Sequence, residues 1–533
     1  MKNQKAYYLD IQTHRKNPYG LLRHSYREDG KIKKETMCRF TGLTLAQLKG
    51  MQAALRGNTV AIDEIKITSS REYGASYACI EIMKNLGLHK SIFSRPNEEW
   101  VRASMAMIAG RIVYPGSKLS LAHRGTHSAI WEICGIENAD VDTHCYEAMD
   151  RLFERQEAIE KSLAAKHLSD GCLVLYDITS SYLEGEYSDS ELVEFGYNRD
   201  KKRGHEQIVI SLLCNKDGCP IATKVLKGNT KDETTVLDQI NDLKLKYGVK
   251  KAIFVGDRGM VTQSKYDEIN HNDISVITAL SHAKIKELCA NNVIQLSLFD
   301  EENIVEVIGE NNLRYCLCKN PLLAVEETKS RETLLQKTAE KLDGIVGCKR
   351  KTKYSKEVRI GRIIDKYKMA KFVIISGTGD DISWKFDQDK INQEQLFDGC
   401  YVVYTDVPAT EMSAVETVKN YKNLIQVEQA FRNLKTARLE VRPIFHKTDD
   451  RIKCHVFICM LSYYVMWHMN QKLKPIFDSD GVGKNRKFTF DYIIESLKCI
   501  RQEEITLCEN TSHIITTPNE EQNHILQLLE IAI

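Results

Sequence analysis

The chain has 533 residues, a formal net charge of +2, 42% hydrophobic residues and 28% charged residues. At about 150 residues per domain, this length predicts two to four globular domains. No apolar run reaches membrane-spanning length and the N-terminus lacks a signal-peptide pattern, so a membrane or secreted protein is not expected. The 16 cysteines are irregularly spaced without a C-x-x-C pair, which favours reduced thiols in a cytosol over a disulfide framework or a zinc site.

Basic residues gather in three clusters, although the chain as a whole is nearly neutral. The clusters lie at 199–205, 349–371 and 432–453. Such runs are usually solvated surface, but three of them favour a phosphate-rich partner. The 349–371 run is the one we expect to make nonspecific contacts with a nucleic-acid backbone, with salt-dependent affinity.

The order of apolar patterns predicts an interrupted α/β core behind an N-terminal region. Short alternating segments predict a small β-containing leader, and amphipathic patterns with periods of three to four residues predict helices after it. From residue 169, buried strands, a hairpin and helices alternate, and a segment of short β-like pieces with one helical piece interrupts them. The predicted parts are 1–70 (leader), 71–168 (helical), 169–282 (core, first part), 283–396 (insertion), 397–472 (core, second part) and 473–533 (C-terminal tail).

Two apolar segments of the predicted core each end in an aspartate. They are GCLVLYDITS, with Asp177, and KAIFVGDRGM, with Asp257. Ligand sites in open α/β sheets gather beyond the carboxyl ends of strands. Each aspartate alone is more often a capping or turn residue. Together with Glu428 on a later helix, however, they make three carboxylates that can hold two divalent ions, and hard oxygen ligands suit Mg²⁺.

The segment YKNLIQVEQAFRNLK, at 421–435, places Tyr421, Glu428 and Lys435 seven residues apart. On one continuous helix the three side chains share a face, because the drift is only about 20° per seven residues. They would be spaced about 10 Å apart, which suits an extended substrate such as a nucleic-acid backbone. The alternative is a solvated face on which Glu428 pairs with Arg432, worth about 0.3–0.5 kcal/mol.

These residues resemble the insertion-sequence DDE transposases of bacteria, which have a ribonuclease-H-like core. The segment at 421–435 is similar to the Y-x2-R-x3-E-x6-K signature of that group, with Tyr421, Glu428 and Lys435 at its Tyr, Glu and Lys. Leu424 stands at the position of the signature's Arg, and Arg432 is our candidate to supply that charge. The segment at 442–455 is also similar to the one located after the Glu in these proteins, and the resemblance covers roughly 170–470.

The resemblance implies an α/β fold: a ribonuclease-H-like mixed sheet flanked by helices, interrupted by a β-rich insertion, with a mostly helical N-terminal region. It implies a transposase that cuts DNA at element ends and transfers the strands to target DNA. Asp177, Asp257 and Glu428 would be the catalytic residues and would ligate two Mg²⁺ ions, with Mn²⁺ able to substitute. The implied DNA-binding residues are Tyr421, Lys435, Arg432, Arg258, Arg442 and Lys201.

The implied partners are double-stranded DNA, as terminal repeats and as target, and a second copy of the chain in the DNA complex. The helical region would bind the ends, the tail would serve assembly, and the protein would work in the cytoplasm on the nucleoid. Two alternatives remain open: a nuclease of the same fold that cuts without joining, and an inactive DNA-binding protein descended from a transposase. For Arg258, and likewise for Arg451 with His455, a local structural pairing is as plausible as a DNA contact.

Overall fold

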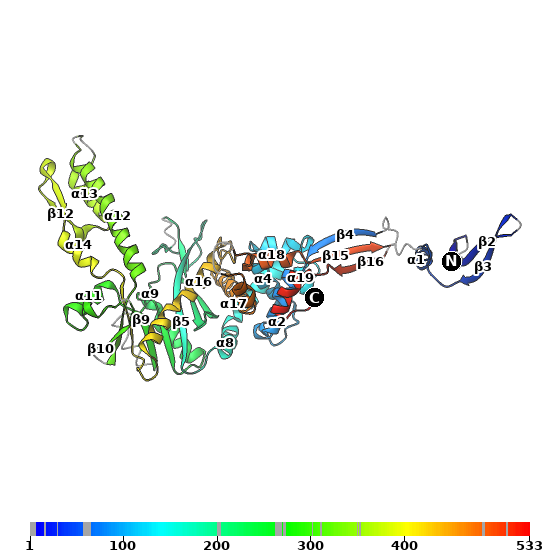
Figure 1. Ribbon diagram of the computed structural model, residues 1–533, viewed down its shortest axis with the longest axis horizontal. Coiled ribbons are helices and arrows are strands. Elements are labelled where there is room, and N and C mark those ends of the chain that lie inside the picture. The colour runs from blue at the N-terminus through cyan, green and yellow to red at the C-terminus, as the bar shows by residue number, and fades with distance from the viewer. Residues whose placement is uncertain are drawn as a thin grey trace. The chain divides into compact units, whose positions relative to one another are not determined.

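The computed structural model divides into two units, and Figure 1 labels their helices and strands. One unit comprises Met149–Trp467, and the other comprises Met1–Ala148 with His468–Ile533. The described residues are 7–14, 17–28, 30–56, 65–199, 204–261, 269, 273–300, 302–309, 312–348, 350, 353–436, 438–481, 486–507 and 510–533.

The unit Met149–Trp467 is built on a mixed eight-stranded sheet with the strand order β10-β11-β14-β9-β8-β5-β6-β7. Strands β5, β8 and β9 run parallel to one another, and the other neighbours pair antiparallel. This confirms the predicted α/β class with a mixed sheet. The strands are β5 (Cys172–Tyr182), β6 (Gln207–Asn215), β7 (Pro220–Lys227), β8 (Ala252–Gly256), β9 (Ile274–Ala279), β10 (Val305–Ile308), β11 (Arg314–Lys319) and β14 (Cys400–Thr405).

The central strands form because both of their faces are buried. On one face of β5, Tyr176 packs on Phe254 of β8 with ring centroids 5.5 Å apart, and helix α9 (Asp232–Asn241) adds Val236 to this core. The turn between β6 and β7 follows the predicted hairpin, and Gly218 adopts φ 82°, a left-handed conformation that glycine tolerates without strain. The other helices wholly within this unit are α8 (Gln156–His167), α11 (His282–Ala290), α12 (Pro321–Val346), α13 (Lys356–Tyr367), α14 (Gln388–Gln395), α15 (Ala414–Lys422) and α16 (Leu424–Lys435).

The insertion at 283–396 differs from its predicted β-rich character. It contains β10 and β11, which extend the main sheet, and a two-stranded sheet of β12 (Val373–Ser376) and β13 (Ser383–Phe386), but its longest elements are α12 and α13. Helix α12 starts sharply because Asn320 caps Leu322 N–H at 3.0 Å and Pro321 occupies the first helical position. Helix α12 includes the one helical piece that the sequence predicted, at 325–342, whereas α13 was not predicted.

An ion pair between buried Arg314 and partly buried Glu306 ties β10 to β11 at the sheet edge. The Arg314 guanidinium donates to both carboxylate oxygens of Glu306, at 2.7 and 2.9 Å, and to the Val407 carbonyl at 2.7 Å. Glu306→Ala is expected to lower the free energy of unfolding by roughly 2–4 kcal/mol, because it leaves a buried guanidinium without its counter-charge. Urea unfolding measures the change, and the exposed Glu302→Ala serves as the control. Equal stability of the two variants would contradict this role for the pair.

The other unit corrects the predicted mostly helical N-terminal region. Its first part, up to Glu72, is β-rich, and it covers the segment in which the sequence predicted a small β-containing leader. Helices then follow, and their core holds Ala78, Ile82 and Met105. The elements of this unit are β1 (Tyr7–Gln12), β2 (Tyr19–Glu28), β3 (Lys31–Phe40), α1 (Leu45–Leu55), β4 (Ile65–Glu72), α2 (Gly74–Asn85), α3 (Leu88–Ile92), α4 (Glu99–Val113), α5 (Lys118–Ala122), α6 (Ile130–Ile133), α18 (Phe490–Lys498), β15 (Arg501–Leu507), β16 (Asn510–Ile515) and α19 (Glu520–Leu529).

Two helices contain a boundary between the units, α7 (Ala148–Glu154) and α17 (Asp449–Ser479). The first turns of α17 include a buried apolar run around Cys454. Among the described residues, no helix combines the length and apolar character required to cross a membrane.

Candidate active site

Strand register brings Asp177 and Asp257 to neighbouring positions. The parallel pairing of β5 with β8 ends at Tyr176 and Gly256, and the two aspartates are the next residue on each strand. Asp257 follows the end of β8, as predicted. Asp177 does not end its strand, because β5 continues to Tyr182 through antiparallel pairing with β6. Asp177 therefore lies at the point where β5 loses one of its two neighbours, which opens space beside it.

The Asp177 carboxyl group lies in an environment that disfavours its charge. Burial raises its pKa to about 7, and the nearby carboxylates of Asp257 and Glu428 act in the same direction. A hydrogen bond of 2.8 Å from the Ile178 N–H and the charge of Arg199 oppose this rise. Asp257 and Glu428 are therefore close enough to Asp177 to raise its pKa, although the ligand atoms of the three acids do not all lie within 4.8 Å of one another.

Glu428 and Tyr421 come from two helices rather than one. Helix α15 ends at Lys422 and α16 begins at Leu424, so the predicted continuous helix over 413–435 is interrupted. At Asn423 the N–H reaches the carbonyls of both Lys419 and Asn420, which tightens the turn there. Tyr421 and Lys435 nevertheless both reach the region where β5 and β8 separate, through Asp257 and Thr179.

Tyr421 reaches the second aspartate from the end of α15. Its hydroxyl donates to Asp257 Oδ1 at 3.4 Å, a long hydrogen bond. Burial raises the pKa of Tyr421, and the charge of Asp257 adds to the rise. Tyr421 is thus kept as a neutral hydrogen-bond donor beside the acids.

Helix α16 brings a cation to the same face of β5 as Asp177. Val427 and Phe431 of α16 are buried, whereas Glu428 is exposed. The Lys435 Nζ donates to Thr179 Oγ1 at 2.6 Å, and Thr179 lies two residues after Asp177 on the same face of the strand. A cavity of about 270 Å³ is lined by Lys435, Arg442 and Tyr182, among others.

The remaining predicted DNA-binding residues differ in their surroundings. Arg258 and Arg432 are exposed, and within the described part of the chain no ion pair joins Arg432 to Glu428, so the simple helix-face pairing is absent. The Arg442 guanidinium lies 4.7 Å from the ring centroid of Tyr182. Lys201 lies outside the described residues.

Arg451 and His455 have structural partners outside the local i,i+4 pairing that the sequence suggested. Arg451 donates to both carboxylate oxygens of Asp150, at 3.0 and 2.9 Å. The buried His455 ring lies 2.9 Å from the Val441 carbonyl oxygen. These contacts join α17 to α7 and to the segment after α16.

Sequence reasoning missed one residue that acts on the acid site. The backbone N–H of Arg199 donates to Ser180 Oγ at 2.9 Å, its guanidinium pairs with Asp232 at the start of α9, and its charge lowers the pKa of Asp177. Its place in the 199–205 basic cluster was the only signal available. The pairing with Asp232 depends on tertiary structure.

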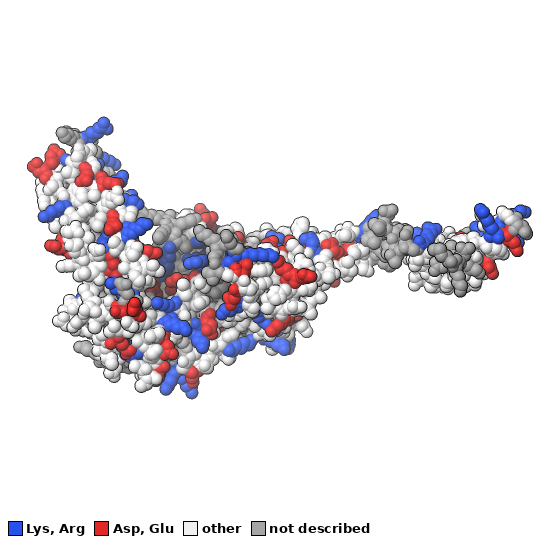
Figure 2. Space-filling model, viewed as in Figure 1, with Lys and Arg blue, Asp and Glu red and all other residues white. Residues whose placement is uncertain are grey.

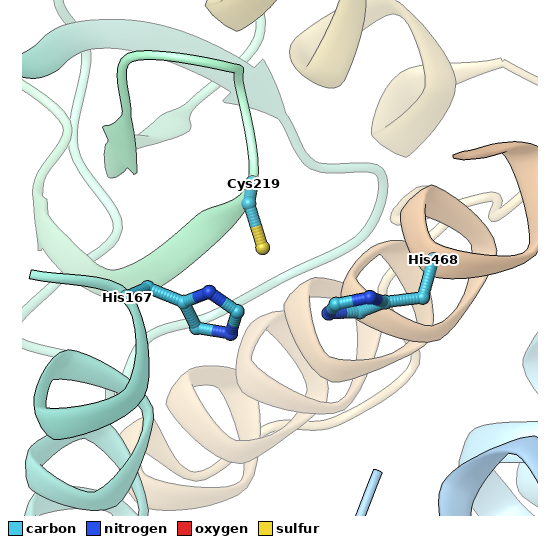
Figure 3. Close-up of side chains that lie close together, drawn as sticks. All are labelled: His167, Cys219 and His468. Carbon is cyan, nitrogen blue, oxygen red and sulfur yellow. The ribbon is translucent and has the colours of Figure 1, made fainter. Parts of the chain in front are cut away.

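Figure 3 shows another set of potential metal ligands, His167, Cys219 and His468, whose ligand atoms lie within 4.8 Å of one another. His167 ends α8 and hydrogen-bonds Tyr464 Oη at 3.0 Å, and burial raises the pKa of the Cys219 thiol. His468 is the first residue of the other unit.

Comparison with known families identifies the part of the chain that carries the acids. The model of the transposase DDE domain matches residues 169–465, more than half of the chain. The chain belongs to the DDE transposase family. The matched region includes Asp177, Asp257 and Glu428, and the mixed sheet with its flanking helices is the ribonuclease-H-like core of this transposase. No curated protein matches the chain.

Proposed function

We propose that this transposase cuts DNA at the ends of its element and transfers the freed 3′ ends to target DNA. The register of β5 and β8, which makes Asp177 and Asp257 neighbours at the site where pairing ends, supports this proposal most directly. Glu428 adds a third carboxylate from a helix that packs against β5. Three neighbouring carboxylates at the edge of a sheet would not stabilise the fold, because burying or crowding negative charges costs free energy. A role in binding cations is therefore the better explanation.

The donor set fits divalent cations. Desolvation and two neighbouring carboxylates disfavour the negative charge of Asp177. A bound cation would offset this unfavourable free energy. Asp177, Asp257 and Glu428 would hold two Mg²⁺ ions, or Mn²⁺ in their place. When bound, the ions supply a polarised attacking oxygen and charge stabilisation at the leaving oxygen.

The chain's own side chains position the DNA strand around the acids. The Tyr421 hydroxyl is placed to donate to a phosphate oxygen beside Asp257, since its present hydrogen bond is long. Lys435 and Arg442 line a cavity next to the acid face of β5 and provide positive charge for the neighbouring phosphates. Exposed Arg258 and Arg432, and Lys201 from the basic cluster, complete the proposed DNA-binding set.

Lys435 provides a test of this positioning role. Lys435→Met is expected to slow DNA cleavage roughly 10- to 100-fold, because a hydrogen bond to a charged group contributes about 1.5–3 kcal/mol. Single-turnover cleavage measures the effect, with the exposed Lys419→Met on the preceding helix as the charge-matched control. Equal cleavage rates for the two variants would remove Lys435 from the DNA-binding set.

Other parts of the proposal concern organisation. The helical region at 71–168 would bind element ends, the tail at 473–533 would support assembly, and two copies would act together so that both ends are cut. The parts 169–282 and 397–472 would form the catalytic core, and the insertion at 283–396 would add backbone contacts through its basic run. With DNA as substrate, the transposase would act on the nucleoid in the cytoplasm.

A cleavage and strand-transfer assay on the element's own end DNA, with Mg²⁺ or Mn²⁺, tests the proposed function. The transposase is expected to nick the end and to join the resulting 3′-hydroxyl to a target plasmid. Cleavage without joining would favour a nuclease of the same fold. Binding without cleavage in either metal would favour an inactive DNA-binding descendant.

A further inference from the structure

The N-terminal module, defined as β1, β2, β3 and α1, is a three-stranded antiparallel sheet with one helix on it. The strands pair in the order β1-β2-β3, and α1 packs on β1 and β2. Leu9 and Leu48 are fully buried between helix and sheet. Gly20 allows this close approach, because a Cβ there would lie 2.9 Å from a Leu48 methyl group.

Part of this sheet extends beyond its own core. Among the residues that the structure describes, β1 pairs with β2 as far as His24, and beyond that point 25–28 pair with 31–34 of β3. We call residues 25–28 and 31–34 the ribbon, and all eight of them are exposed. A two-stranded hairpin with both faces in water is marginally stable by itself, which makes this ribbon a candidate binding element.

The ribbon is strongly basic. It carries Arg27, Lys31, Lys33 and Lys34 against one acid, Glu28, which pairs with Lys33. Among the residues that the structure describes, no ion pair involves Arg27, Lys31 or Lys34. Figure 2 shows Lys and Arg side chains on this hairpin, with acidic side chains beside them. An apolar protein partner fits poorly, because Ile32 and Tyr26 are the only large apolar side chains that the ribbon presents.

We propose that the ribbon enters the major groove of double-stranded DNA and contributes to recognition of the element's ends. This inference rests on the proposed function and adds a DNA contact outside the helical region at 71–168. The major groove is about 12 Å wide and admits a two-stranded ribbon. Four residues of strand span about 14 Å, enough to reach the groove floor about 8.5 Å deep.

Strand register assigns the ribbon side chains to two faces. Ser25 lies opposite Lys34 and Arg27 opposite Ile32 on one face, while Tyr26 lies opposite Lys33 on the other. The first face combines an arginine, which can bond guanine O6 and N7, with an apolar side chain that suits the thymine methyl group. Lys31 and Lys34 are placed for phosphates along the groove.

The test compares two double variants of the full-length transposase with equal charge changes in the same module. Arg27→Ala with Lys34→Ala alters the ribbon, and Lys49→Ala with Arg56→Ala alters exposed cations of α1 and its C-terminal cap. Fluorescence anisotropy without metal follows binding to short duplexes that tile the DNA on either side of the coding sequence. The ribbon variant is expected to lose at least about 10-fold in affinity for the preferred duplex, and the α1 variant less than about 3-fold.

A chemical footprint identifies the groove. Dimethyl sulfate reacts with guanine N7 in the major groove, so wild-type transposase should protect guanines that the ribbon variant leaves reactive. Equal affinity of the two variants, or no preferred duplex for the wild type, would overturn the inference. Failure of the proposed function would look different. In that case the ribbon would still contribute to DNA binding, but the protein would not cleave DNA in Mg²⁺ or Mn²⁺.

Discussion

Asp257→Asn and Glu428→Gln are each expected to reduce DNA cleavage and joining by at least about 1,000-fold, with binding of end DNA retained. Each change removes a carboxylate charge while keeping the size of the side chain. Both residues are exposed, so neither change should unfold the protein. The loss would follow from the proposed metal site, in which each acid would contribute oxygen ligands that the other two cannot replace.

The matched control for Asp257 is Asp273→Asn. Asp273 is also an exposed acid next to a parallel strand, but it precedes β9 rather than following it and so lies at the opposite end of the sheet. Its backbone is left-handed, with φ 53°, a conformation that asparagine accepts. Cleavage by Asp273→Asn should match wild type. Normal cleavage by Asp257→Asn would make Asp257 a turn or capping residue. Normal cleavage by either Asp257→Asn or Glu428→Gln would show that the proposed catalytic set is wrong.

Asp177→Asn is expected to abolish cleavage while making the metal-free fold more stable at neutral pH. The folded pKa of about 7 exceeds the usual aspartate value of 3.8, so the folded protein binds this proton more tightly than the unfolded chain does. Stability from this group is therefore fully present below about pH 4 and is lost as pH rises through about 7. Asparagine, which has no charge to bury, removes that loss.

The size and pH range of the effect can be measured by urea unfolding in EDTA at several pH values. Each pKa unit corresponds to about 1.4 kcal/mol, and Asp177 keeps some solvent exposure, so we expect a gain of roughly 1–3 kcal/mol at pH 8 and almost none at pH 4. Added Mg²⁺ should stabilise wild type but not the variant. A variant that is less stable than wild type at pH 8 would contradict the charge-burial explanation.

The local sequence predicted the strands and helices that carry the acids, but it did not predict which other segments pair with those strands. KAIFVGDRGM indicated that Asp257 follows a buried strand, because a short apolar run ending in a polar turn is a local pattern, and the structure agrees. The same reasoning ended β5 at Asp177. The strand continues because β6 supplies an antiparallel partner, and that partner is distant in sequence.

The helix over 413–435 shows a related limit. Its amphipathic period was correct on both sides of Asn423, but the turn that separates α15 from α16 carries no glycine or proline to mark it. Tyr421 and Lys435 nevertheless both reach the part of the sheet where β5 and β8 separate. Tyr421 meets Asp257, whereas Lys435 meets Thr179, on a different strand.

By itself, the sequence determined the α/β class, the strand-end position of Asp257, the KDG hairpin turn and the family resemblance through Asp177, Asp257 and Glu428. Those features depend on local periodicity, turn residues and residue spacing, all of which can be read from the sequence alone. Only the tertiary structure decided that β5 and β8 pair in the register that makes the two aspartates neighbours, and that Arg199 acts on Asp177 from across the site. Register and charge coupling arise between segments far apart in the chain, so their free energies appear only when the strands and helices pack.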